Sequence, residues 1–146
     1  MNWKEEAIRK LREYEPMRQA IVNISRQMRQ LEDEYQTIRS QSFTGRRTVA
    51  SPGCRENQMM NNIVRRQELQ QSLDRVCLWM ETVDGALKVL EPEEQEILQR
   101  MYVFPQKGAL DTVCDALHLE KSSVYRRRDK ALRKFTLAMY GATESN

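Results

Sequence analysis

The sequence is poor in residues that interrupt helices. Only five glycines and four prolines occur among its 146 residues. Aromatic residues make up 7% of the chain and charged residues 31%, a balance typical of long exposed helices and not of sheets or loop-rich folds. Almost no segment shows the alternating pattern of a half-buried strand. The composition therefore predicts an all-α protein, either one domain or a small domain with an oligomerisation arm.

Long apolar runs are missing as well. No stretch approaches the roughly 18 apolar residues that span a bilayer, and no N-terminal apolar run resembles a signal peptide. We therefore expect a cytoplasmic protein with no membrane partner. Cys54, Cys77 and Cys114 are widely spaced and lack neighbouring ligands at metal-site spacing, so we expect ordinary thiols and no bound metal.

Groups that perform catalysis are equally scarce. The only histidine is His118, and acid-base chemistry would need a second group paired with it in a pocket. The sequence contains no glycine-rich phosphate loop and no nucleophile elbow. We expect neither an enzyme nor a cofactor, and we assign no catalytic residue.

What the chain does contain is a basic segment near its C-terminus. Apolar residues at helical spacing predict a first short helix over residues 110–117: Leu110, Val113, Cys114 and Leu117. Residues 118–120 then form a turn, and Glu120 or Ser122 is placed to cap a second helix. One side of that helix is expected to be buried through Val124, Ala131, Leu132 and Phe135.

Positive charge collects on this second helix. Between Lys121 and Lys134 lie seven lysines or arginines and a single acid, Asp129. Seven acids precede it, which predicts separate acidic and basic faces: Glu91, Glu93, Glu94, Glu96, Asp111, Asp115 and Glu120. A second helix of this kind enters the major groove, where basic side chains hold phosphates and read bases. The candidate DNA-binding residues are Lys121, Ser122, Ser123, Arg126, Arg127, Lys130, Arg133 and Lys134.

The same region carries a family resemblance. Residues 87–137 resemble the fourth region of sigma-70-type sigma factors, through an opening helix and a closing basic motif: Leu87, Leu90, Pro92, Glu94, Ile97, Leu98, Met101 and Tyr102, then Lys130, Ala131, Leu132, Lys134 and Phe135. The sequence departs from that pattern in the turn and in the basic helix, at His118, Glu120, Arg127 and Arg128. The resemblance implies a helix-turn-helix in which Lys121, Ser122 and Arg126 face bases while Arg127, Lys130, Arg133 and Lys134 hold the backbone.

Combined with a helical N-terminal half, this layout resembles small phage and prophage transcription regulators of the RinA and ArpU type. The resemblance implies a sequence-specific regulator that binds double-stranded promoter DNA and activates late genes together with RNA polymerase. No segment resembles the aromatic-rich sigma region that melts promoters. The chain is therefore not expected to act as a complete sigma factor.

The N-terminal half shows two heptad patterns separated by a polar loop at residues 40–57. A short amphipathic segment over residues 2–14 precedes them, and Pro16 is expected at the first position of a new helix. The first heptad pattern comprises Tyr14, Met17, Ile21, Ile24, Met28, Leu31, Tyr35 and Ile38. The second begins loosely at Met59, Ile63 and Leu69 and continues through Leu73, Val76, Met80, Val83, Leu87 and Leu90.

These patterns predict a helical hairpin arm over residues 1–88 and a DNA-binding domain over residues 89–146. Gly85 is a candidate hinge between them. Whether the two long helices pair within one chain or between chains stays open. A hairpin alone buries little apolar surface, so we expect a homo-oligomer, with a dimer favoured.

Two other functions fit the same fold. Phage terminase small subunits also join a helix-turn-helix to an oligomerisation arm, and they recognise packaging sites instead of promoters; such subunits commonly form rings. In the other alternative, the C-terminal domain binds only protein. The density of arginine on the second helix argues against that alternative.

Overall fold

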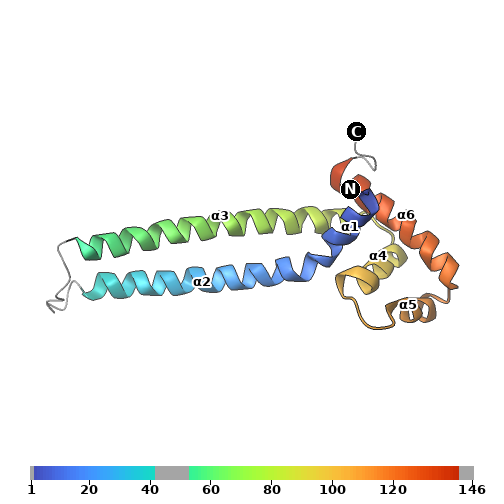
Figure 1. The fold of residues 1–146 in the computed structure, drawn as a ribbon, viewed down its shortest axis with the longest axis horizontal. Helices are drawn as coiled ribbons and strands as arrows, with labels where there is room; N and C mark the ends of the chain where they lie inside the picture. The colour runs from blue at the N-terminus through green and yellow to red at the C-terminus, as the bar shows by residue number, and fades with distance from the viewer. Residues whose placement is uncertain (1, 42–52, 142–146) are drawn as a thin grey trace. The chain divides into compact units, whose positions relative to one another are not determined.

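The computed structural model describes residues 2–41 and 53–141. These residues form six α-helices and one π-helical segment, with no strand among them, so the predicted all-α class is confirmed. The elements are α1 (Trp3–Arg12), α2 (Tyr14–Gln41), α3 (Cys54–Lys88), α4 (Pro92–Leu98), η1 (Gln99–Val103), α5 (Ala109–Leu117) and α6 (Lys121–Tyr140) (Figure 1). None of these helices is long and apolar enough to cross a membrane.

Contacts between residues divide the chain into two compact units. Unit 1 comprises Met1–Arg18 and Leu78–Asn146, and unit 2 comprises Gln19–Cys77. This division differs from the predicted boundary between residues 88 and 89. Most of the predicted loop, including Arg46 and Arg47, lies outside the described residues, but its two ends are helical because α2 continues to Gln41 and α3 begins at Cys54.

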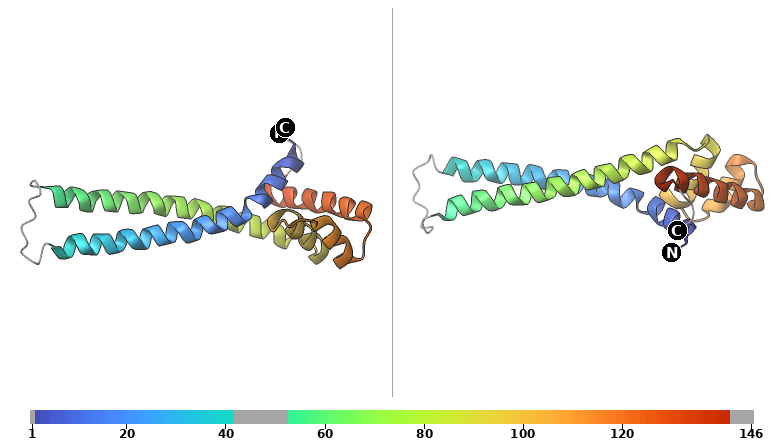
Figure 2. Two further views of the ribbon diagram at one scale, coloured as in Figure 1. Left: turned by 60° about the horizontal axis from the view of Figure 1, so that its bottom comes forward. Right: turned by 90° about the horizontal axis from the view of Figure 1, so that it is seen from above.

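Unit 2 consists of the facing parts of α2 and α3, which lie side by side and run in opposite directions (Figures 1 and 2). The α2 side chains that are half-buried in this unit include all the heptad residues predicted there: Ile21, Ile24, Met28, Leu31, Tyr35 and Ile38. The sequence therefore identified the apolar stripe of α2 correctly.

The stripe of α3 contains two polar residues that the apolar pattern did not reveal. Asn62 is buried, and with Arg66 it completes an unbroken 3,4 spacing from Met59 to Leu69. The Asn62 Nδ2 donates to the Leu31 carbonyl oxygen at 2.8 Å, and the Arg66 Nε donates to Asn62 Oδ1 at 2.9 Å. The Arg66 guanidinium also lies 5.0 Å from the centre of the Tyr35 ring. Both hydrogen-bonding groups of the buried amide thus have partners.

Asn62→Leu is expected to leave the melting temperature of unit 2 unchanged or higher, while making the molecular mass of the protein depend more strongly on concentration. A buried asparagine in a heptad stripe costs stability but selects one pairing, since other pairings leave its amide without partners. Circular dichroism melts and light scattering at several concentrations measure the two effects. Asn61→Leu, at the exposed neighbouring position, is the control. A lower melting temperature with unchanged mass would contradict this role.

Unit 1 has an apolar core to which the N-terminal helix contributes directly. Ala7 and Leu11 of α1 are buried in one cluster with Val83 of α3 and with Leu132 and Phe135 of α6. The apolar side predicted for residues 2–14 is confirmed, because all five of its residues belong to or pack against this cluster: Trp3, Ala7, Ile8, Leu11 and Tyr14. The Tyr14 hydroxyl donates to Asp84 Oδ1 at 2.7 Å, a bond that raises the pKa of Tyr14 to about 12.

Two local details differ from expectation. The new helix begins at Tyr14, so Pro16 occupies its third position and not its first; its missing N–H falls within the first turn, where the amides have no intrahelical partner in any case. After α4 the backbone continues as the π-helical segment η1, which places Tyr102 and Val103 in the core. A π-turn inserts one extra residue per turn, which a regular helical pattern does not predict.

Candidate nucleic-acid interface

Helices α5 and α6 are joined by a very short turn. His118 adopts the left-handed conformation with φ of 54° and is the one non-glycine residue with positive φ among the described residues. The Leu119 N–H donates to the Cys114 carbonyl at 3.1 Å, which closes the end of α5. Glu120 occupies the N-cap position of α6, as one of the two predicted alternatives required, but its side chain makes no capping hydrogen bond.

The predicted apolar side of α6 is confirmed. Val124, Ala131, Leu132 and Phe135 are all fully buried. Val124 contacts Ile97 and Val113 in a small cluster formed with α4 and α5, whereas the other three belong to the larger core of unit 1. This burial from both ends fixes the rotation of α6 and therefore determines which of its side chains point outward.

The outward side of α6 carries the first group of candidate residues. Ser122, Arg126, Lys130 and Arg133 are exposed and recur every three or four residues, so they form one row along the helix. Arg126 and Arg133 have no ion-pair partner among the described residues. At the N-terminal end of the helix Ser123 is half-buried, and the exposed Lys121 pairs with Asp111 of α5 at 3.7 Å. We call Ser122, Arg126, Lys130 and Arg133 the outward row.

The other two candidates, Arg127 and Lys134, are seven residues apart and are held by the acidic first turn of α4. Arg127 pairs with Glu93, and the Lys134 Nζ lies 2.8 Å from Glu94 Oε1. The structure therefore does not bring all eight predicted residues together, because α4 holds these two cations. We call Arg127 and Lys134 the inward pair. Sequence alone showed the acidic turn but could not show which cations it faces.

Glu94 is buried despite its charge. Only 5% of the residue is exposed, and its Oε1 accepts from Lys134 and, at 3.2 Å, from the Glu91 backbone N–H. Burial by itself raises the pKa of the Glu94 carboxyl, but the hydrogen bonds from Lys134 and the Glu91 backbone outweigh it, so the pKa lies below its ordinary value of 4.5. The carboxylate is thus the form that the folded protein favours.

Unit 1 is expected to lose stability as the pH falls below the ordinary pKa of glutamate. A folded-state pKa that is depressed adds stability above the unfolded pKa, and that stability disappears as the pH falls through the folded value. Trp3 and Trp79, the only tryptophans, pack against the core of unit 1. Tryptophan fluorescence during thermal unfolding between pH 7 and pH 3 therefore measures the effect.

Lys134→Gln should weaken this acid dependence and lower the melting temperature at pH 7, since Glu94 loses the partner that stabilises its charge. Arg133→Gln, which removes an exposed cation from the same helix, should change neither. Parallel acid profiles for Lys134→Gln and the wild type would contradict the role of the pair.

The single acid of α6 is also neutralised, in part by a residue that sequence reasoning missed. Asp129 accepts from Arg128 at 2.9 Å and lies 3.3 Å from Lys4 of α1. The Arg128 guanidinium in turn lies 4.9 Å from the centre of the Tyr125 ring. Burial raises the pKa of Asp129, but hydrogen bonds from Arg128 and Lys4 outweigh it and the pKa is lowered. Contact between α1 and α6 produces this arrangement, so no local sequence pattern signals it.

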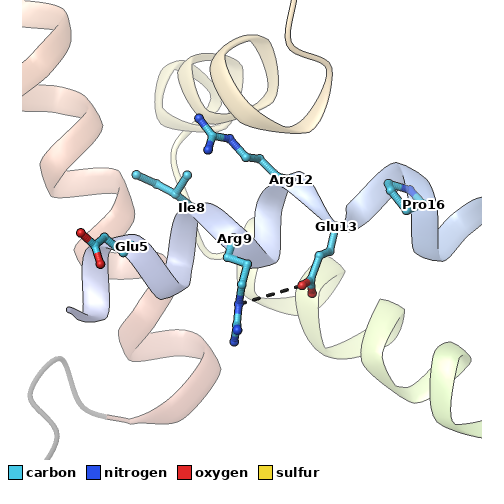
Figure 3. A pocket seen from close by; sticks show the side chains of 6 residues that line it. All are labelled: Glu5, Ile8, Arg9, Arg12, Glu13 and Pro16. Carbon is cyan, nitrogen blue, oxygen red and sulfur yellow. Dashed lines mark ion pairs between the residues drawn. The ribbon is translucent and has the colours of Figure 1, made fainter. Parts of the chain in front are cut away.

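A hollow of about 350 Å³ lies elsewhere in unit 1, against α1 and the start of α2 (Figure 3). Ile8 and Pro16 line it together with charged residues of both signs, and Arg9 pairs with Glu13 at 3.9 Å. None of the predicted site residues lines this hollow. Within residues 2–41 and 53–141, no group of three or more acidic, histidine or cysteine side chains is placed to hold a metal ion.

Comparisons with protein families, with curated protein sequences and with solved structures find no match to this chain. We therefore infer its function from the side chains of α4, α5 and α6.

Proposed function

We propose that the protein is a sequence-specific regulator of phage or prophage transcription that binds double-stranded DNA through α6. It would act at late promoters together with RNA polymerase, as the resemblance to the RinA and ArpU type implies. The observation that carries this proposal is the outward row. Ser122, Arg126, Lys130 and Arg133 are exposed on one side of α6, while Val124, Ala131, Leu132 and Phe135 anchor the opposite side in the core.

The length and chemistry of α6 suit the major groove. Its 20 residues extend over about 30 Å, and the groove admits a single helix. Ser122 and Arg126 lie in its first two turns, the part of a recognition helix that meets base edges. Lys130 and Arg133 follow in later turns, where they would hold phosphates. We assign Lys134 to the stability of unit 1, because it neutralises the buried Glu94.

The turn between α5 and α6 supports a helix-turn-helix. Its His118 adopts the left-handed conformation, which glycine adopts most easily and which the corresponding glycine of the sigma-factor motif would supply. The substitution that departs from the family pattern in sequence therefore keeps the backbone conformation. A homodimer formed through unit 2 would present two such helices to two half-sites.

Arg126→Ala and Arg133→Ala should affect binding in different ways. Loss of a base contact at Arg126 should reduce discrimination between the upstream DNA of the protein's own operon and random duplex by about 1–3 kcal/mol. Loss of a phosphate contact at Arg133 should weaken binding to both DNAs equally and lower the salt slope by about 0.9. Fluorescence anisotropy titrations at several salt concentrations measure both quantities.

Arg65→Ala provides the matched control, since Arg65 is an exposed arginine of unit 2 that pairs only with Glu68 at 3.4 Å. Equal losses on both DNAs for Arg126→Ala and Arg133→Ala would refute the assignment of the base contact. Absence of binding to any duplex at low salt would refute the DNA-binding function itself. A ring-like assembly in light scattering would favour the genome-packaging alternative.

A further inference from the structure

The pairing of Arg127 with Glu93 leaves a cation of α6 beside the DNA-binding row but already neutralised. Both side chains are about half exposed, 44% for Arg127 and 54% for Glu93. The neighbouring pair differs, because the Glu94 side chain is only 6% exposed and is held by two hydrogen bonds. Of the inward pair, Arg127 is therefore the residue that can be released without leaving a buried charge unpaired.

An exposed ion pair is weakly held and is screened by salt. A backbone phosphate offers the same guanidinium two charge-assisted hydrogen bonds in the fork geometry that arginine prefers. Arg127 follows Arg126 directly on α6, so it flanks the row that we propose to enter the groove. Glu93 and DNA phosphate are thus alternative partners for one side chain.

The surroundings of Arg127 act in the same direction. Glu91, Glu93, Glu94, Arg127 and Lys130 line one hollow of about 250 Å³. A phosphate that approached Arg127 would therefore enter a space bordered by three carboxyl side chains. Like charges at short distance repel each other, so these acids oppose the approach of phosphate as well as occupying the cation.

We propose that Glu93 limits the affinity of the protein for the DNA backbone by competing with phosphate for Arg127. The inference rests on the proposed DNA-binding function and adds a residue of α4 that sets its strength. Affinity for random DNA depends mainly on how many phosphates the protein neutralises. Withholding one arginine shortens the time spent on random sites, while the base contacts of the outward row remain available.

The test compares the salt dependence of binding to random duplex DNA for the wild type, Glu93→Gln, Arg127→Ala and the double variant. Glu93→Gln should steepen the salt slope by about 0.9, the value for one additional phosphate contact, and raise affinity roughly fivefold to tenfold at about 0.1 M salt. Arg127→Ala alone should change the slope little, because Arg127 does not contact phosphate in the wild type. The double variant should return to the behaviour of Arg127→Ala, since the gain requires Arg127.

Glu96→Gln is the matched control. Glu96 lies on the same helix and pairs with Arg100 at 3.0 Å, so its substitution removes the same charge without releasing a cation of α6. Thermal unfolding of each variant separates changes in binding from changes in folding. If the wild type binds no duplex at low salt, the proposed function and this inference both fall. If the wild type binds but Glu93→Gln matches Glu96→Gln, or Arg127→Ala alone lowers the slope by about 0.9, only the inference is overturned.

Discussion

Leu11→Ala is expected to lower the free energy of unfolding of unit 1 by about 2–5 kcal/mol, the usual cost of removing a fully buried leucine side chain. Leu11 has no exposed surface, and it packs in the same cluster as Leu132 and Phe135 of α6. The substitution therefore loses buried apolar surface and leaves a cavity beside the helix that carries the outward row. Urea denaturation followed by tryptophan fluorescence measures the loss, because Trp3 and Trp79 both pack against this core.

The control for this prediction is Leu78→Ala, since Leu78 belongs to unit 1 but is 65% exposed. It should change the free energy of unfolding by about 0.5 kcal/mol or less. A fragment limited to residues 89–146 should fail to fold for the same reason, because it lacks Ala7, Leu11, Val83, Ala86 and Leu87 of the cluster. Equal destabilisation by the two leucine substitutions would contradict the contribution of α1 to the core.

Replacing Arg126, Lys130 and Arg133 together by alanine should reduce affinity for random duplex DNA by several hundredfold at about 0.1 M salt. Three lost phosphate or groove contacts correspond to a decrease in the salt slope of about 2.7, at about 0.9 for each. The three side chains are exposed on one side of α6, so the protein should remain folded. Anisotropy titrations over a range of salt concentrations give both the affinity and the slope.

A charge-matched control separates this effect from a general loss of positive charge. Arg55, Arg65 and Arg75 are exposed on α3 within unit 2. Their replacement by alanine removes the same three charges and should change the salt slope far less, because only screened long-range attraction is lost. Similar losses for the two triple variants would mean that DNA binding does not depend on α6.

The comparison of sequence with structure is instructive for the two long helices. The apolar stripe of α2 followed directly from its heptad spacing, because alternating intervals of three and four residues place side chains on one side of a helix. The stripe of α3 did not, because Asn62 and Arg66 occupy positions that the pattern reserves for apolar residues. Their place in the stripe depends on the Leu31 carbonyl and the Tyr35 ring of the facing helix.

The sequence by itself determined the helical class, the buried side of α6 and the positive charge on that helix, since these depend on the spacing and type of residues within single segments. The tertiary structure decided which of those charges are available. Glu93 and Glu94 hold Arg127 and Lys134, while Lys4 and Arg128 neutralise Asp129. Most of these pairs join residues far apart in the chain, and their formation depends on how α1 and α4 pack against α6. No periodicity within one segment encodes the distance between two segments, so only the packed structure separates the outward row from the inward pair.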